Sequence, residues 1–149
     1  MPSFQIPLFP TQRSKTGKKV GAALNRLSRV VETGGWKIDD DLAQGMLLTD
    51  IAFGYDWAYP YLSSEQRKRG AQTLVTLANY SKKTFPGYFQ KETATAFNNH
   101  THWNHVGVGA AGFATAGEHP DGRALAEESY RWFTGVFLPV ALYHAVGRG

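Results

Sequence analysis

The stretch FNNHTHWNHVGVGAAGFATA, residues 97–116, concentrates more chemistry than any other part of the chain. Its first half holds three of the five histidines, at positions 100, 102 and 105, among asparagines and a tryptophan. Its second half consists mostly of glycine and alanine, which allow a neighbouring backbone to approach closely. We therefore predict a helix that runs to about Ala116, has Gly117 at its C-cap position, and carries a polar site at its start.

Two helix patterns open the chain. Over residues 14–31 apolar side chains recur every three or four positions, opposite a basic face. The next helix is predicted over about 40–59, with aspartates at its start and Pro60 as its stop. It is apolar on two sides, which predicts burial between layers and partners for Asp50 and Asp56. Its two faces consist of Leu42, Met46, Phe53 and Trp57, and of Leu48, Ile51, Tyr55 and Tyr59.

Two further patterns complete the fold prediction. Ser63 followed by Gln66 is a capping box, and the helix that it opens is predicted to reach about Lys82. The last helix begins at residues 120–121, and Pro139 should kink it or end its first part. No run alternates with the period of two that marks a half-buried strand. We therefore predict an all-α fold of antiparallel helical neighbours joined by short loops.

The composition is that of one globular domain. Of the 149 residues, 42% are hydrophobic and 13% aromatic, which is sufficient for a packed core. Residues 1–13 contain three prolines and are predicted to form a flexible leader, followed by a single domain over 14–149. The chain has no cysteine, which excludes disulfide and thiolate chemistry. Neither a signal peptide nor a transmembrane run is visible, so we predict no membrane contact.

The charge is moderately basic, with a formal value of +4 and a pI near 9.4. Much of it lies in two clusters, at residues 13–29 and 67–69. A solvated basic face explains such clusters, and a surface that meets a polyanion is the alternative. Nucleic acid is not predicted as a partner, because no recognised binding motif accompanies the charge.

The triplet Asn98-Asn99-His100 lies where loop becomes helix. Backbone amides are free at this position, and the helix dipole favours an anion. An amide donor beside an imidazole could therefore bind and neutralise a carboxylate. The alternative is that Asn98 or Asn99 only caps the helix, while His100 is an ordinary interior residue.

The other two histidines of the stretch lie on a different side of the predicted helix. At 100° per residue, His102 and His105 share one side, away from His100 and Asn104. A spacing of three allows two metal ligands, but a third would have to come from elsewhere in the chain. The alternative is that both histidines pack against neighbouring helices. We predict no metal and no other cofactor.

Several aromatic residues are either part of the core or available to stack on a sugar. Most large rings of this kind belong to the core, but flat amphipathic rings also suit the faces of sugars. The residues concerned are Tyr55, Trp57, Tyr59, Tyr61 and Trp103.

Three motifs in sequence order resemble the heparinase II/III-like polysaccharide lyases. Residues 52–67, AFGYDWAYPYLSSEQR, are similar to the "AYDW…LSPEQR" phrase of that family. Residues 98–103 match its "NNH…W" motif, and residues 110–117, AAGFATAG, are similar to its "AAGLALAG" helix. The resemblance extends over about residues 39–142.

This resemblance implies a partial (α/α) toroid that acts on an acidic polysaccharide, either alginate or a glycosaminoglycan. The reaction would be β-elimination beside a uronate carboxylate, which needs no redox cofactor. Asn99 and His100 match the catalytic pair that holds the carboxylate, while Asn98, Trp103 and Tyr55 would contact the substrate. A periplasmic or secreted location is also implied.

The chain departs from the family in two respects. The usual acid/base tyrosine lies well beyond the NNH motif, and we do not transfer its role to Tyr130 or Tyr143. The C-terminal β-sandwich of the family is absent. We therefore expect a fragment of a lyase that is inactive alone. The alternatives are a non-catalytic carbohydrate-binding or scaffolding module, and a metal-dependent hydrolase that uses His102 and His105.

Overall fold

The computed structural model describes residues 10–89 and 97–147, with side chains from Ser14 onward, and these residues form helices and no strand. The predicted all-α class is confirmed. The α-helices are α1 (Pro10–Glu32), α2 (Asp41–Ala58), α3 (Ser64–Thr84), α4 (Asn99–Thr115), α5 (Gly122–Trp132) and α6 (Leu138–Val146), with 3₁₀ turns at Tyr59–Tyr61 and Pro86–Phe89. None of the described helices is long and apolar enough to cross a membrane.

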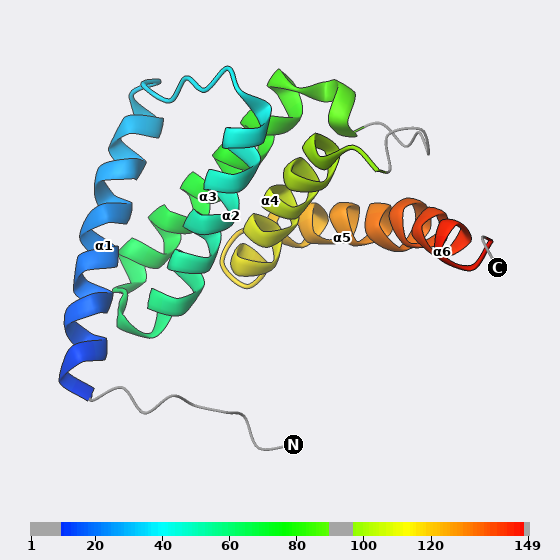
Figure 1. Cartoon of the computed structure of the whole chain (residues 1–149). Helices are drawn as coiled ribbons and strands as arrows, with labels where there is room; N and C mark the ends of the chain where they lie inside the picture. Colours follow the sequence, from blue (N-terminus) through cyan, green and yellow to red (C-terminus); the bar gives the residue numbers. More distant parts are fainter. Residues whose placement is uncertain (1–9, 90–96, 148–149) are drawn as a thin grey trace.

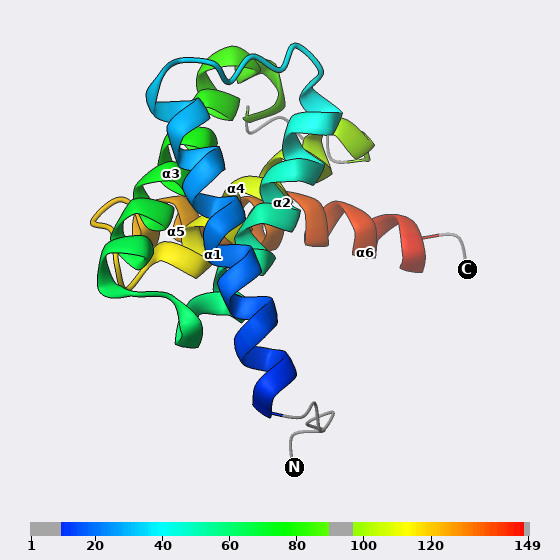
Figure 2. The ribbon, with the colours of Figure 1, turned by 90° about the vertical axis from the view of Figure 1, so that its left-hand side faces the viewer.

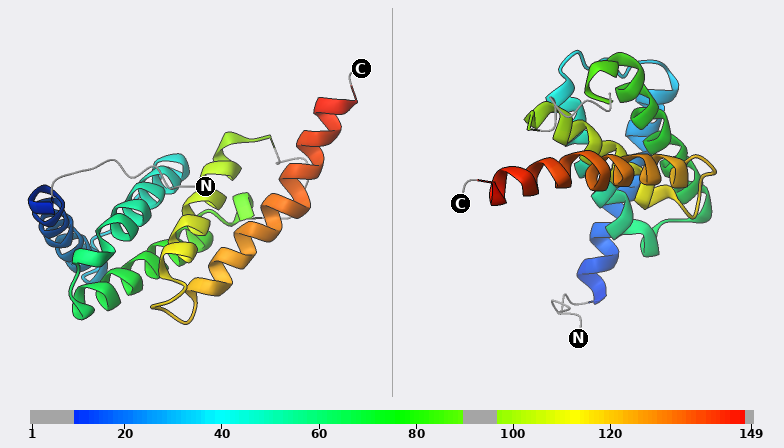
Figure 3. Two further views of the ribbon diagram at one scale, coloured as in Figure 1. Left: turned by 90° about the horizontal axis from the view of Figure 1, so that it is seen from below. Right: turned by 90° about the vertical axis from the view of Figure 1, so that its right-hand side faces the viewer.

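The first four helices alternate in direction. In Figure 1, α1 and α3 run upward while α2 and α4 run downward. The most extensive packing is between α2 and α4, and α1 packs on α3, so that two layers of parallel helices face each other. The view from below in Figure 3 shows the same zigzag order. Because α2 and α4 are parallel, their N-terminal ends lie at the same end of the molecule.

The last helical segment turns back after α4, and in the view from below in Figure 3 α5 runs beside α4 in roughly the opposite direction, packed extensively against it. Figures 1 and 2 both show α5 and α6 at a large angle to α1, with the C-terminal end directed away from the other helices. Between α5 and α6, residues Phe133–Phe137 form a π-helical turn. Pro139 follows it in the first turn of α6. Proline lacks the N–H of a regular helix, so the predicted interruption takes the form of a π turn.

The core lies between the two layers. Tyr55 is fully buried, and its hydroxyl donates a hydrogen bond of 3.0 Å to the Arg67 carbonyl. One stripe on α3 is buried throughout and comprises Leu74, Leu77, Ala78 and Ser81. The Ser63–Gln66 capping box is present in both directions. It satisfies two otherwise free amides at the start of α3.

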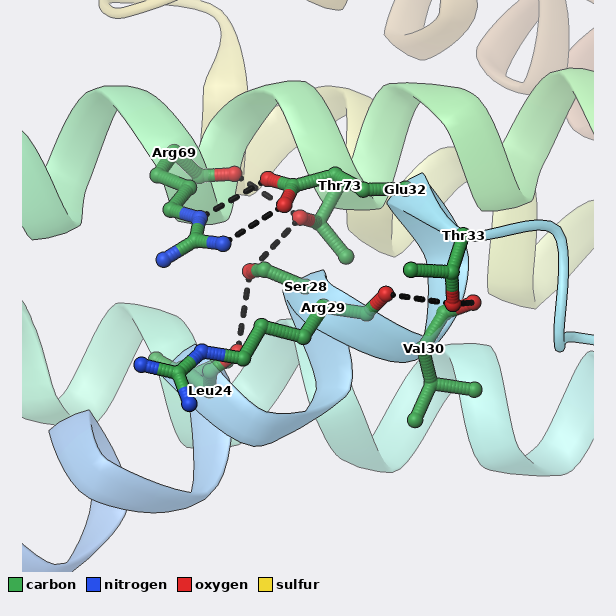
Figure 4. A network of polar contacts seen from close by, with 8 residues as sticks. All are labelled: Leu24, Ser28, Arg29, Val30, Glu32, Thr33, Arg69 and Thr73. Carbon is green, nitrogen blue, oxygen red and sulfur yellow. Dashed lines mark hydrogen bonds and ion pairs between the residues drawn. The ribbon is translucent and has the colours of Figure 1, made fainter.

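Polar contacts join α1 to α3 across their interface (Figure 4). The buried hydroxyls of Ser28 and Thr73 lie 2.8 Å apart, and Ser28 donates to the Leu24 carbonyl at 2.9 Å. Arg69 makes a two-pronged contact with Glu32, at 2.8 and 2.6 Å. This hydrogen-bonded guanidinium lowers the pKa of Glu32. The exposed ion pair thus covers a short buried polar contact.

Two details of the prediction are wrong at the helix ends, the start of the first helix and the glycine cap of the central one. The first helix begins at Pro10 and not at Ser14, so residues 10–13 belong to α1, whereas positions 1–9 of the predicted leader lie outside the described residues. The central helix ends at Thr115 with Ala116 as its C-cap, in right-handed conformation. Gly117 does not adopt the positive φ of a glycine cap, since Gly34 is the glycine with positive φ in the described part.

The prediction that α2 is buried on both faces is also wrong. The face with Leu48, Ala52 and Tyr55 is in the core, but Met46, Phe53 and Trp57 on the other face are exposed. Asp50 and Asp56 are exposed as well and need no buried partners. A helix that is apolar all round needs packing on every side to be buried. The described residues supply it on one side only.

Candidate functional site

The N-terminal ends of α2 and α4 approach closely because glycines line their contact. A Cβ on Gly45 of α2 would lie 2.7 Å from the carbonyl of Trp103, and one on Gly107 of α4 would lie 2.6 Å from the Gly45 carbonyl oxygen. The glycine stripe of α4 therefore brings two backbones into direct contact. Side chains from the first turns of both helices meet as a result.

His100 and Asp41 form the centre of this meeting point. Nδ1 of His100 lies 2.9 and 3.1 Å from the two carboxylate oxygens of Asp41. The Asp41 side chain is 14% exposed and that of His100 is 39% exposed. The carboxylate accepts a hydrogen bond from Nδ1–H, and the other ring nitrogen, Nε2, lies on the opposite edge of the ring.

Asn104 hydrogen-bonds to both residues of the pair. It is fully buried, one turn along α4 from His100. Its Nδ2 donates to Oδ2 of Asp41 at 3.0 Å and to the His100 carbonyl at 2.9 Å. The carboxylate therefore accepts two hydrogen bonds from α4, and these fix its orientation. Tyr88 stacks on the other side of the imidazole, with ring centres 5.6 Å apart.

The start of α2 is also held from the other layer. Asp40 caps the helix by accepting from the amide of Ala43 at 2.8 Å. Gln44 is buried, accepts from Trp36 Nε1 at 2.9 Å and donates to Ser81 Oγ at 2.9 Å. Asp41 is thus presented to His100 by a helix end with little freedom to move.

The two asparagines before His100 have different roles. Asn98 is the N-cap of α4, and its side chain accepts from the His100 amide at 2.9 Å. This is the capping alternative of the sequence analysis. Asn99 is the first residue of α4, and its side chain is exposed beside His100. Asn99 and His100 are thus the first two residues of α4, at an accessible helix N-terminus where backbone amides favour an anion.

The remaining predicted contacts differ in accessibility. Trp103 lies one turn along α4 from His100 and is 37% exposed. Tyr55 has no exposed surface and lies in the core, 14 residues after Asp41 on α2. It cannot touch a ligand in this structure. Burial also raises the pKa of Tyr55.

The predicted separation of the histidines is confirmed. His105 stacks on Trp132, with ring centres 4.1 Å apart, and His102 lies edge-on to Phe137 at 4.5 Å. Both therefore face α5 and the π turn, whereas His100 faces α2. Within the described ranges, no group of three or more histidine and carboxylate side chains is placed to hold a metal ion. These contacts match the packing alternative.

Burial gives His105 unusual electrostatics. Neither ring nitrogen has a hydrogen-bond partner of normal geometry in the described part of the chain. Burial lowers the pKa of His105 to about 4, and the backbone of Tyr88 opposes this shift only in part. The imidazole is therefore neutral at pH 7 and packs as an aromatic ring.

Sequence reasoning missed Asp41, Asn104 and Tyr88 as parts of the site. Asp41 was interpreted only as favourable charge at a helix start. The four-residue spacing of His100 and Asn104 did place them on one face, and this was the available signal for Asn104. Nothing in the sequence pairs residues 41 and 100, because their contact requires α2 and α4 to be parallel neighbours.

Comparisons with known proteins give no match: no family model, no curated protein and no solved structure is similar to this chain.

Proposed function

We propose that this chain is the helical part of a heparinase II/III-like polysaccharide lyase and that it binds the uronate carboxylate of its substrate with His100 and Asn99. The observation that carries the proposal is the partly exposed imidazole of His100, at the start of α4. Asp41, at the start of α2, fixes it through Nδ1. The three motifs of the resemblance also support it. The two layers of alternating helices are compatible with part of an (α/α) toroid.

The geometry suits the binding of an anion by Nε2. When His100 carries its proton, both ring nitrogens donate: Nδ1 to Asp41, and Nε2 to a group outside the protein. The side-chain amide of Asn99 and the free amides at the start of α4 add donors on the exposed side. A carboxylate bound there would meet a charged donor at a helix N-terminus, which is a favourable position for negative charge.

This arrangement supplies one requirement of β-elimination, the stabilisation of the uronate carboxylate. A base takes the C5 proton of a uronate, which places negative charge on its carboxylate; the bond between C4 and the glycosidic oxygen then breaks to leave a C4–C5 double bond, and the departing oxygen takes up a proton. Donors directed at the carboxylate stabilise the charge as it develops. Electrons are redistributed within the sugar alone, so no oxidant or reductant takes part. The proposed substrate is an acidic polysaccharide, and a periplasmic or secreted location goes with it.

Absorbance near 235 nm tests the proposal, because the unsaturated uronate absorbs there. The chain should be incubated with alginate, heparin, heparan sulfate, chondroitin and hyaluronan in turn. We expect no rise from this chain alone, and a rise with one class of polymer from a form extended through the following residues of its gene. In that form, His100→Ala should lose about 100-fold or more, as for removal of one oxyanion donor. His119→Ala is the matched control. This histidine follows the C-terminal end of α4, away from His100, and contacts Gln72 of α3.

A second function, a non-catalytic carbohydrate-binding module, is favoured by one observation. Trp57 and Tyr61, two of the aromatic residues with a possible role in sugar binding, are exposed and not in the core. Polymer binding without any rise in absorbance from the extended form would support this module and contradict the lyase. The absence of both binding and absorbance with all five polymers would contradict both functions.

A further inference from the structure

A cavity of about 890 Å³ lies between α1 and the C-terminal end of α2. Its lining combines the two lysines Lys15 and Lys19 of α1 with Trp57 of α2 and Tyr61 of the following 3₁₀ turn. Asp41 is at the other end of α2, 16 residues from Trp57, which is roughly 24 Å along a helix. The cavity is therefore separate from the His100 site.

Glycines shape this cavity. A Cβ on Gly17 would lie 2.4 Å from Cβ of Tyr61, so only glycine at this position lets the Tyr61 side chain lie against α1. Gly54 also lines the cavity, and a Cβ there would meet nothing within 4 Å. Gly17 thus allows Tyr61 to line the cavity, and Gly54 places no side chain in it.

The chemistry of the lining is that of a ring platform beside cations. Trp57 is 77% exposed and stacks on Phe53, with ring centres 6.1 Å apart, so its position is supported from one side. Tyr61 is 40% exposed. Lys15 and Lys19 are exposed and stand one turn apart on α1. Flat amphipathic rings bind the apolar faces of sugars, and ammonium groups bind carboxylate or sulfate.

We propose that this cavity is a second binding site for an acidic saccharide, whose ring packs on Trp57 while its anionic group contacts Lys15 and Lys19. The choice of a saccharide over another flat anion rests on the proposed function. The formal charge of +4 on the whole chain also favours an anionic ligand. A polymer bound here would be held at the opposite end of α2 from His100.

The test uses the whole chain with its four tryptophans replaced by 5-fluorotryptophan, and the ¹⁹F resonances assigned by Trp→Phe variants. Tetrauronate prepared from alginate is titrated first, then the same tetrasaccharide with its carboxyls reduced, then uridine monophosphate. We expect the Trp57 resonance to move with tetrauronate. The affinity should fall roughly tenfold in Lys15→Gln/Lys19→Gln, for a loss of about 1.4 kcal/mol. The control is Lys68→Gln/Lys83→Gln, which removes the same charge from exposed positions of α3.

The outcomes separate the two proposals. A Trp57 shift that persists in His100→Ala supports the second site, whether or not His100 binds uronate. No Trp57 shift, or an equal shift with the reduced tetrasaccharide, overturns the second site even if the 235 nm signal is present. Tighter binding of uridine monophosphate than of tetrauronate overturns the saccharide as its ligand. Equal losses of affinity in the two double variants would show that Lys15 and Lys19 act only through the net charge of the protein, and would overturn the proposed contact.

Discussion

Replacement of Gly45 by alanine is expected to destabilise the protein by about 3 kcal/mol, at the upper end of the usual cost of overpacking. The new methyl group would lie 2.7 Å from the Trp103 carbonyl and 3.0 Å from the Asn104 amide nitrogen. Both neighbours are backbone atoms and cannot rotate away as a side chain would. In a chain of this length, the midpoint of thermal unfolding should fall by roughly 6–12 °C.

Gly54→Ala is the matched control in the same helix. A Cβ at this position meets nothing within 4 Å, so the change should stabilise α2 by about 0.5–1 kcal/mol through the helix propensity of alanine. Urea denaturation followed by circular dichroism measures both variants. Similar stabilities for Gly45→Ala and Gly54→Ala would contradict the close contact of α2 and α4, and with it the basis of the His100–Asp41 pair.

The second large effect concerns pH and His105. Its pKa is about 4 in the folded state, against about 6.5 in the unfolded chain, so the folded state disfavours the proton. The stability that follows is fully present above pH 6.5 and is lost as the pH falls toward 4. The difference of about 2.5 pKa units corresponds to about 3 kcal/mol.

Comparison with His105→Phe isolates this contribution. Phenylalanine keeps a ring against Trp132 but has no proton to bind. We expect the free energy of unfolding of the wild-type protein to fall by about 3 kcal/mol more than that of His105→Phe between pH 7 and pH 4. Carboxylates that titrate in the same range affect both proteins alike and cancel in the comparison. Parallel curves would show that His105 does not resist protonation in the folded state.

Much of the secondary structure could be predicted because its signals are local. The capping box at Ser63, the aspartate before α2 and the stop at Pro60 each act within one helical turn. The glycines of α4 likewise predicted a close contact, although not the helix that makes it. Gly117 shows the limit of such rules, because the helix ended without the left-handed glycine cap that the residue permits.

Burial could not be predicted where it depends on what lies opposite. Tyr55 and Trp57 are two positions apart on the same apolar helix, yet one is in the core and the other is exposed. The sequence pattern of α2 is equally apolar on both sides and does not show which side meets a neighbour. The same reason explains why Tyr55 was assigned to the substrate site when its ring packs inside.

The candidate site was predicted in part. Asn99 and His100 were identified from their type and their place at a helix start, and the structure leaves both accessible. Asp41 could not be identified as the partner of His100 from 59 positions away, because two parallel helices are required to bring them together. Their contact depends on Gly45 and Gly107, so the same glycine pattern that predicts packing also determines the site.

The central claim is that His100 binds the carboxylate of a uronate. Its most direct test is an NMR titration of the imidazole ring signals with tetrauronate and with the same tetrasaccharide after reduction of its carboxyls. We predict that the His100 signals move with tetrauronate alone, that those of His119 do not move, and that Asp41→Asn weakens the response. Unchanged His100 signals, or equal shifts with the reduced saccharide, would contradict the claim.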